Sequence, residues 1–228
     1  MARGYDNPRF NQVMVLDLQF CEGVGVPTLD WAKPHHEPNT LVNAPVWTNA
    51  INDLTFLYFD GVAAYPHIVT LSGDSGDLDF TSGGFSGMCW YYPSAGGNRY
   101  IFNKGTGATG WTFYLNTDNE MSLGTRQAAA TQFSHGNVLT LNAWQLVGFS
   151  RDGATARIYT NGLERTTTYA THINPDSSAA QNFYIGCTNA VGAGWMVGYL
   201  WRPRILSRAT TAAEHLAVYE IERGLFGV

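Results

Sequence analysis

The run from Trp144 to Gly162 constrains the fold of this chain more than any other stretch. It has the pattern of three strands joined by two tight turns, at Asp152-Gly153 and Asn161-Gly162. Such dipeptides are typical of two-residue hairpins, because type I′ turns need a positive φ at both central residues. The run therefore predicts an antiparallel sheet, and it carries no sign of catalytic chemistry.

Alternating apolar residues extend this prediction to most of the chain. Trp144 and Leu146 share one face of a strand, and Val147 and Phe149 share the other. Residues 13–20 alternate most clearly, and one face there carries Met14, Leu16, Leu18 and Phe20. Roughly a dozen short strands at such spacing predict an all-β fold, a two-sheet antiparallel sandwich. Residues 21–46 lack a strand pattern and are expected to be irregular.

One helix is expected, at the C-terminus. Thr211 and Glu214 have the spacing of a capping box, in which each side chain accepts a hydrogen bond from the backbone amide of the other residue. Gly224 is expected to end the helix. The face expected to pack against the edge of the sandwich carries Ala213, Leu216, Ala217 and Ile221.

Composition and charge narrow the class of protein. Charged residues make up only 14% of the 228 residues, well below the usual quarter, so Ser, Thr, Asn, Gln and Gly must cover much of the surface. The net charge of -5 and pI of about 5.6 argue against non-specific nucleic-acid binding. No apolar run approaches the ~20 residues of a membrane span, and the N-terminus lacks a secretory signal. We expect a domain over residues 13–228 preceded by an arm, residues 1–12.

In order and spacing, these segments resemble a laminin-G-like domain of the concanavalin A-like lectin/glucanase superfamily. The matching pieces are Leu16–Phe20, Leu57–Gly61 with Tyr65, Phe85–Trp90, Ile101–Gly105, Leu141–Trp144, Arg151–Gly153, Ile158–Gly162, Tyr184–Gly186, Gly198–Ile205, and Leu206–Ala209 with Glu214. The resemblance implies a jelly roll of two curved sheets. It also implies a binding function, toward glycans or proteins.

The sequence argues against a hydrolase, so we predict that the protein is not an enzyme. Jelly-roll glucanases of this superfamily carry two catalytic glutamates on one strand, as glutamate-x-aspartate-x-glutamate, which places both carboxylates on one face. None of the seven glutamates forms that pattern. Glu220 and Glu222 lie on the expected helix, where positions two apart diverge.

No metal or nucleophile motif stands out. His35 and His36 are adjacent in a proline-flanked segment and are expected to be solvated, since neighbouring side chains point apart. The three cysteines, Cys21, Cys89 and Cys187, lack metal-ligand spacing and are expected to be buried thiols.

Calcium is the one cofactor left open, because many laminin-G-like domains bind it. Asp60, with Asp30 and backbone carbonyls, could supply the oxygen ligands that a hard cation needs. The alternative is that Asp60 caps its own turn. No cofactor is otherwise required.

Aromatic residues beside Gly- and Asn-rich loops are the remaining candidates for a binding site. Flat rings flanked by amides suit the faces of sugars, whereas a sandwich of this size also needs many aromatic residues in its core. The candidates are Tyr91, Tyr92, Trp111, Tyr114 and Trp195.

Compact laminin-G-like chains of this kind resemble those in tailed-phage structural gene clusters. The resemblance implies a virion-associated surface protein for capsid decoration or adhesion, made in the host cytoplasm. Its expected partners are virion proteins such as a major capsid protein, a second copy of the chain, and a cell-surface glycan. The arm would dock on the shell through Arg3, Tyr5, Arg9 and Phe10. The alternative is a free carbohydrate-binding lectin-like module.

Overall fold

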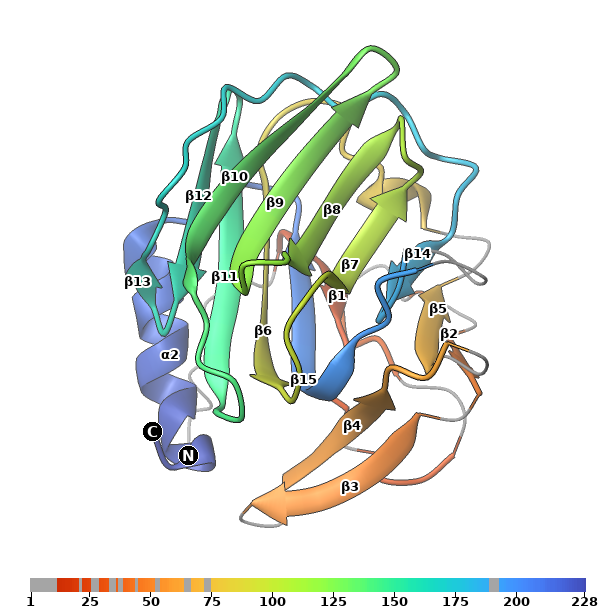
Figure 1. Cartoon of the computed structure of the whole chain (residues 1–228), viewed down its shortest axis with the longest axis vertical. Coiled ribbons are helices and arrows are strands. Elements are labelled where there is room, and N and C mark those ends of the chain that lie inside the picture. Colours follow the sequence, from red (N-terminus) through yellow and green to blue (C-terminus); the bar gives the residue numbers. More distant parts are fainter. Residues whose placement is uncertain are drawn as a thin grey trace.

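The structure is a computed structural model, and it describes residues 12–20, 22–25, 29–32, 36, 39–43, 45–51, 54–63, 67–71, 75–188 and 193–228. Their strands form two antiparallel sheets, which we call the back sheet and the front sheet after their positions in Figure 1. Residues 1–11 of the predicted arm, together with Cys21, His35 and Tyr65, lie outside the described residues. No helix within these ranges is long and apolar enough to cross a membrane.

The back sheet takes four of its eight strands from each half of the chain. Its order is β13 (Leu163–Glu164), β12 (Thr155–Thr160), β11 (Gln145–Asp152), β6 (Phe85–Pro93), β15 (Val197–Leu206), β4 (Leu54–Asp60) and β3 (Val46–Ile51), and β1 (Met14–Asp17) also pairs with β15. A bulge between Met14 and Leu16 breaks the predicted common face of β1. As a result, Leu16 packs between the sheets, whereas Met14 joins the cluster on the outer side.

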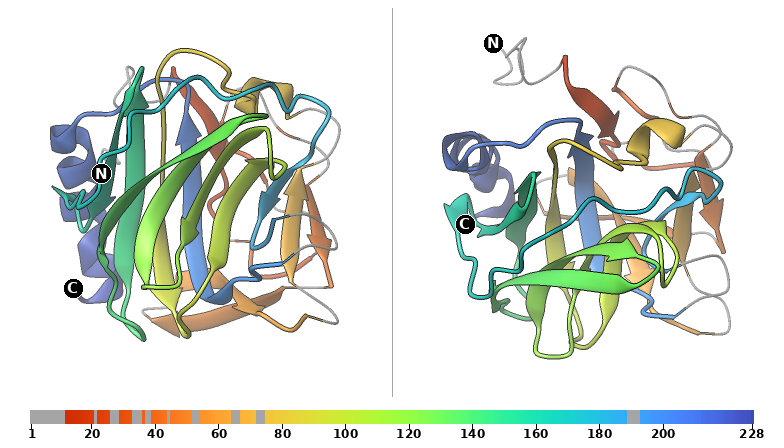
Figure 2. Two further views of the ribbon diagram at one scale, coloured as in Figure 1. Left: turned by 45° about the horizontal axis from the view of Figure 1, so that its top comes forward. Right: turned by 90° about the horizontal axis from the view of Figure 1, so that it is seen from above.

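The front sheet overlies the back sheet in Figure 1, and Figure 2 shows the two layers from above. Its order is β10 (Ala130–Val138), β9 (Glu120–Gln127), β8 (Gly110–Leu115), β7 (Arg99–Gly105), β14 (Phe183–Ile185), β5 (Ile68–Leu71) and β2 (Asn39–Val42). A short 3₁₀ helix, η1 (Gly76–Leu78), follows β5. The segment expected to be irregular thus contains β2, and the predicted sandwich of two antiparallel sheets is confirmed.

Aromatic side chains fill the space between the sheets. Trp111 of the front sheet packs against Phe85 and Phe149 of the back sheet, with ring centroids 5.1 and 5.7 Å apart. Val147 and Phe149 face this core, whereas Trp144 and Leu146 face outward into a second cluster, as alternation predicts. Each face of the back sheet therefore has its own apolar layer.

The two predicted turns are both present, with one difference in type. In the second turn Asn161 and Gly162 have φ values of 51° and 75°, as type I′ requires. In the first turn Asp152 pairs with Thr155, so the central residues are Gly153 and Ala154. Only Gly153 has a positive φ, 56°, which fits a type II′ turn instead of the expected type I′.

Helix α2 (Ala212–Phe226) covers the outer face of the back sheet (Figure 1). The capping box of Thr211 and Glu214 is confirmed. The predicted stop at Gly224 is wrong, because the helix continues to Phe226 and ends at Gly227, whose φ of 69° is left-handed.

The predicted packing face of α2 is also wrong. Leu216 and Ile221 are exposed by 39% and 50%, and the face that packs on the sheet carries His215, Val218, Glu222 and Phe226. Glu222 is buried because Arg204 of β15 binds its carboxylate with two hydrogen bonds of 3.1 and 2.9 Å. Trp90 Nε1 donates a third, at 2.8 Å. A buried charge with these partners makes a polar residue the anchor of the helix.

Candidate functional site: an aromatic face on the front sheet

The outer face of the front sheet brings together side chains that are far apart in the sequence. Strand register places Tyr100, Tyr114, Ser122 and His135 in one row across β7, β8, β9 and β10. The next row contains Asn103, Thr112, Gly124 and Phe133. Paired residues point to the same side of a sheet, so both rows face away from the core.

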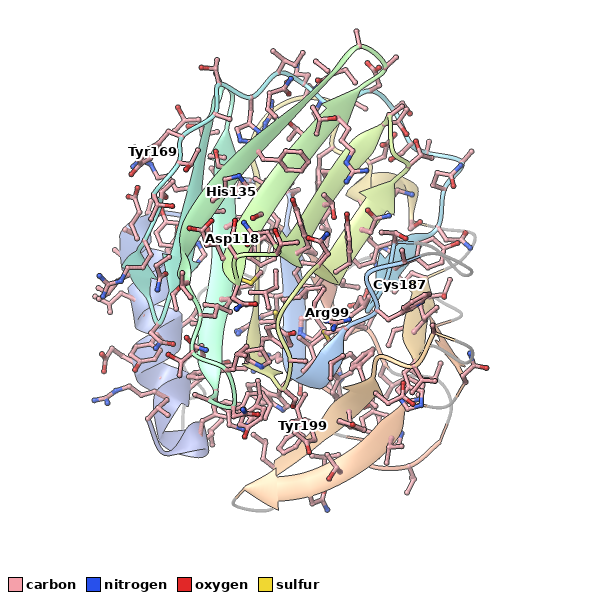
Figure 3. The ribbon with its side chains drawn as sticks, in the orientation of Figure 1. Arg99, Asp118, His135, Tyr169, Cys187 and Tyr199 are labelled. Carbon is pink, nitrogen blue, oxygen red and sulfur yellow. The ribbon has the colours of Figure 1, made fainter. Side chains whose placement is uncertain are left out.

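Phe133 and His135 form what we call the ring platform. Their rings are nearly parallel, at 16°, with centroids 6.3 Å apart along β10. The ring of Phe133 lies across the neighbouring strand at Gly124, where a Cβ would sit 2.6 Å from its Cε1 atom. Only the missing side chain of Gly124 allows this position. Both platform residues are partly exposed, and Figure 3 shows His135 on this face.

Neighbouring residues hold the platform in place. Ser122 Oγ and His135 Nδ1 are hydrogen-bonded at 2.6 Å, which orients the imidazole. Tyr114 meets Phe133 edge to face, at 72°, and stacks on Tyr100 with centroids 4.9 Å apart. These fixed rings can receive a flat apolar surface without first being ordered.

Polar groups lie at both ends of this face. Glu120 and Arg126 are on the same side of β9 as Ser122 and Gly124, six residues or about 20 Å apart. Arg126 Nη1 donates to Thr106 O, and Glu120 accepts from Asn116 Nδ2. The face therefore offers an apolar centre with hydrogen-bonding ends, the combination that small-molecule and glycan sites use.

Of the aromatic residues predicted as candidates, Tyr91 and Trp111 are in the core. They are 0% and 1% exposed, and Trp111 Nε1 donates to Leu78 O at 2.8 Å inside the protein. The expectation that they are exposed is wrong, because alternation along β6 and β8 turns them inward. A Trp111→Ala variant would test the core, not a binding site.

The other three candidates are not part of the cluster between the sheets, and they do not lie at one site; Tyr114 is nevertheless buried, at 9% exposed. Tyr114 belongs to the aromatic face. Trp195 is partly buried beside Tyr184 near the other end of the front sheet. Tyr92 is on the outer face of the back sheet, where it packs against Trp144 and Tyr199, the latter shown in Figure 3.

His36 is not a solvated loop residue, as the sequence had suggested. It is 2% exposed and lies between two carboxylates, with Nδ1 2.5 Å from Asp30 and Nε2 2.8 Å from Asp77. Burial by itself would lower the pKa of His36, but the two hydrogen-bonded carboxylates raise it to about 9. His36 is therefore charged at neutral pH and joins the segment around Asp30 to η1.

The residues considered for calcium have protein partners. Asp60 Oδ1 accepts from Val62 N at 3.0 Å, which closes the turn, and Oδ2 lies 3.4 Å from His67. Asp30 accepts from the backbone amides of Asp17 and Ala32. Within the described ranges no three His, Cys, Asp or Glu residues are grouped to hold a metal ion. A structural calcium ion stays a prediction.

Cys89 and Cys187 are both buried, as predicted. Burial raises the pKa of Cys89, so its thiol stays protonated.

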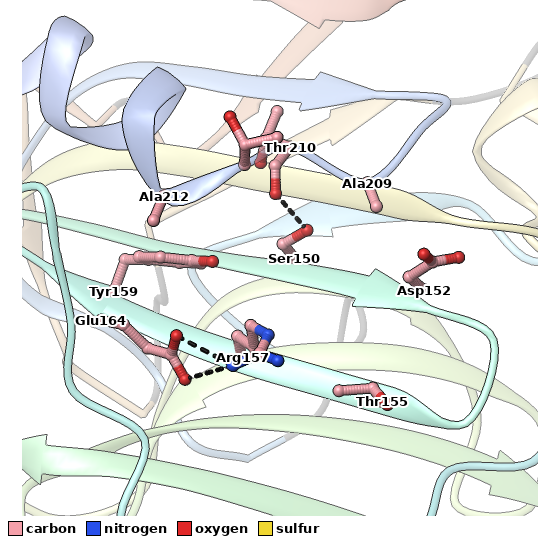
Figure 4. A pocket seen from close by; sticks show the side chains of 10 residues that line it. Ser150, Asp152, Thr155, Arg157, Tyr159, Glu164, Ala209, Thr210 and Ala212 are labelled. Atoms are coloured by element: carbon pink, nitrogen blue, oxygen red, sulfur yellow. Dashed lines mark hydrogen bonds and ion pairs between the residues drawn. The ribbon is translucent and has the colours of Figure 1, made fainter.

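A shallow groove of about 370 Å³ lies on the back sheet, between β12 and the start of α2 (Figure 4). Its lining includes Asp152, Thr155, Arg157, Tyr159 and Glu164 from the strands and Thr210 from the segment before the helix. No sequence motif marked it, because β12 and α2 meet only in the folded chain.

Two facing antiparallel sheets with an open outer face define a jelly roll of the lectin type. A family model described as the concanavalin A-like lectin/glucanases superfamily (Laminin_G_3) matches residues 67–214. The chain belongs to this superfamily. No curated protein sequence matches the chain.

Several solved structures share the fold. One comes from botulinum neurotoxin type C, which depends on interaction with two ganglioside molecules to reach the cell interior (TM-score 0.71, 12% identity, 93% of this chain and 52% of that chain). The serotype G binding domain matches at TM-score 0.69 and 14% identity, over 92% and 51%. The serotype DC binding domain solved with SialylT matches at 0.67 and 12%, over 92% and 51%. The chain thus spans about half the length of these structures.

Proposed function

We propose that the protein is a non-enzymatic glycan-binding module and that the ring platform is its binding surface. The observation that carries the proposal is the pair of nearly parallel, partly exposed rings of Phe133 and His135, of which Phe133 lies over Gly124 and His135 is hydrogen-bonded to Ser122. The apolar face of a pyranose can stack on such rings while its hydroxyls reach polar groups beside them. Among the toxin proteins that share the fold, type C depends on two ganglioside molecules and the DC domain was solved with SialylT, which agrees with this proposal, although the DC domain was also solved with rat synaptotagmin II. They match over only half their length, so the proposal rests on the platform.

The carboxylates near the platform support a binding role over hydrolysis. Glu120 is hydrogen-bonded to Asn116, and the other carboxylate nearby, Asp118, lies on the turn before β9 (Figure 3). Glycoside hydrolysis needs two carboxyl groups facing each other across the scissile bond. The glutamate-x-aspartate-x-glutamate strand that supplies them in the glucanases is missing from the whole sequence.

Replacing Phe133 by alanine is expected to weaken binding of the preferred glycan roughly tenfold or more, which corresponds to about 1.4 kcal/mol. The ring is partly exposed, so the fold should persist. A glycan array with the wild-type protein identifies the ligand, and calorimetry with that ligand measures the change. Tyr169→Ala, which removes a ring that is 60% exposed and lies outside the platform, is the control. Equal affinity in wild type and Phe133→Ala would refute the platform.

Gly124→Ala tests the geometry without removing any ring. The new methyl group would meet the end of the Phe133 side chain, so the ring must swing away from the sheet. Gly124 does not have a positive φ, so alanine does not strain the backbone. We expect the same loss of glycan binding as in Phe133→Ala, with near-native stability. The change in ring position can be followed by the chemical shifts of His135.

We propose the surface of a tailed-phage virion as the place where this module acts, with the arm docking on a capsid protein or on a second copy of the chain. The low content of charged residues, 14% of the chain, supports this setting. Electron microscopy of the native particle tests it, because density for the sandwich should repeat over a shell or tail. A chain found unattached to particles would favour the free lectin-like module instead.

A further inference from the structure

The groove on the back sheet is lined both by a hydrogen-bond acceptor, the carboxylate of Asp152, and by hydroxyl groups that can donate. Arg157 Nη1 binds both carboxylate oxygens of Glu164, at 2.8 and 2.9 Å, so these two charges largely cancel. Asp152 stands at one end with no hydrogen bond to its carboxylate from the described residues. Tyr159 is 2% exposed, and its hydroxyl points into the groove (Figure 4).

Thr210 supplies a buried donor to the same groove. It is 4% exposed, and its Oγ1 is 2.8 Å from His215 Nε2. Burial lowers the pKa of His215 to about 3, so the ring is neutral and carries one N–H. Nδ1 has no partner among the described residues, so placing the proton on Nε2 gives that N–H its acceptor. The hydroxyl hydrogen of Thr210 is then left to donate, and the groove is beside it.

We propose that this groove is a second sugar site, which binds a neutral pyranose through two adjacent hydroxyl groups. The two oxygens of Asp152 can accept from a vicinal diol, as a carboxylate accepts from any pair of neighbouring donors. Thr210, Tyr159 and Thr155 supply hydroxyls for the other oxygens of the sugar. An anionic ligand would meet the unpaired charge of Asp152, because Glu164 already neutralises Arg157.

This inference does not rest on the ring platform. The groove belongs to β11, β12 and the start of α2, and the platform belongs to β10 of the other sheet. A variant of either site leaves the residues of the other unchanged, so the two proposals can fail separately.

Asp152→Asn is the variant that tests the groove. Asp152 is an exposed residue at the end of β11 that flanks the turn, and asparagine has nearly the same size and shape, so the fold should be kept. Thr155→Val is a second, isosteric variant at an exposed position. Asp118→Asn, on an exposed turn away from the groove, is the matched control for loss of one carboxylate.

The experiment is a titration of ¹⁵N-labelled protein, followed by NMR, with methyl glycosides of mannose, galactose and glucose. We expect at least one glycoside to shift the amides of residues 150–155 and 209–212. We also expect trans-1,2-cyclohexanediol to shift the same amides and cyclohexanol, with a single hydroxyl, not to do so. Asp152→Asn should weaken the response at least tenfold, whereas Asp118→Asn and Phe133→Ala should not change it.

Three outcomes would overturn the proposal. They are no shift at these amides with any of the three glycosides, an equal response to cyclohexanol, and a response that Asp152→Asn leaves intact. If Phe133→Ala loses glycan binding at the platform while its groove response is unchanged, that result supports both the groove site and the ring platform as separate binding sites.

Discussion

Replacing Glu222 by alanine is expected to lower the free energy of unfolding by about 3–5 kcal/mol, the largest effect of any substitution considered for α2. Glu222 is 1% exposed and Arg204 is 0% exposed, so the variant leaves a guanidinium in the interior without its carboxylate. Burial already lowers the pKa of Arg204 to about 9, yet the group stays charged at neutral pH. Removing Glu222 takes away two hydrogen bonds to this buried charge together with its ion-pair partner.

The effect should spread through the cluster that fixes the helix. Trp90 Nε1 loses its acceptor, and the ring of Trp90 stacks on Phe226, with centroids 4.1 Å apart, at the end of α2. Arg202 lies 3.7 Å from Glu222 and is also bound to Asp17 of β1. The loss of one carboxylate thus loosens α2 from β6 and β15 together.

Urea denaturation of wild type and Glu222→Ala measures this change, and Glu220→Ala is the matched control. Glu220 lies two residues away on the same helix, but its side chain is 53% exposed and its ion pair with Arg223 is at the surface. We expect a change within about 0.5 kcal/mol for the control. Similar losses in the two variants would show that the buried ion pair does not anchor the helix.

The same helix shows how far the sequence could predict the fold. Its start was predictable because Thr211 and Glu214 act on each other locally. Its buried face was not, because the choice between Ile221 and Glu222 depends on Arg204, which becomes a neighbour only when β15 is in place. Local apolar periodicity favoured the wrong face.

In the candidate site too, positions set by local alternation could be predicted, and positions set by contacts between strands could not. Alternation along residues 111–115 already separates Trp111 from Tyr114, so the inward position of Trp111 could have been predicted. The ring platform could not, because it needs the register that sets Phe133 opposite Gly124. The turn between those strands, Ala128-Ala129, has none of the Gly, Asn or Asp residues that mark a hairpin.

Acidification is expected to destabilise the protein by about 3 kcal/mol through His172 alone, between about pH 6.5 and about pH 4. His172 is 2% exposed and lies between Thr125 Oγ1, 2.8 Å from Nδ1, and Ser134 Oγ, 2.9 Å from Nε2. Burial and the charge of Arg151 lower the pKa of His172 from 6.5 to about 4. The two hydroxyls suit a neutral ring, which needs one acceptor and one donor.

The sign of this change in stability follows from which state, native or unfolded, binds the proton first as the pH falls. As the pH falls below 6.5, the histidine of the unfolded chain takes up a proton while the buried ring of the native state does not. The stability due to the neutral ring is therefore fully present above about pH 6.5 and is lost as the pH falls through about 4. His215, with its pKa lowered to about 3, adds a loss of the same sign that also begins below about pH 6.5 and continues to about pH 3, in wild type and variants alike.

Urea denaturation at about pH 7 and about pH 4 gives the difference in unfolding free energy for each variant. His172→Gln is less stable at neutral pH but does not titrate, so its loss between the two pH values should be smaller than that of wild type by about 3 kcal/mol. Thr155→Val, at an exposed position, keeps every titratable group and should lose as much as wild type. Carboxylates contribute equally to all three proteins, so the comparison isolates the histidine. An equal loss in His172→Gln and wild type would mean that His172 is not held neutral in the native state.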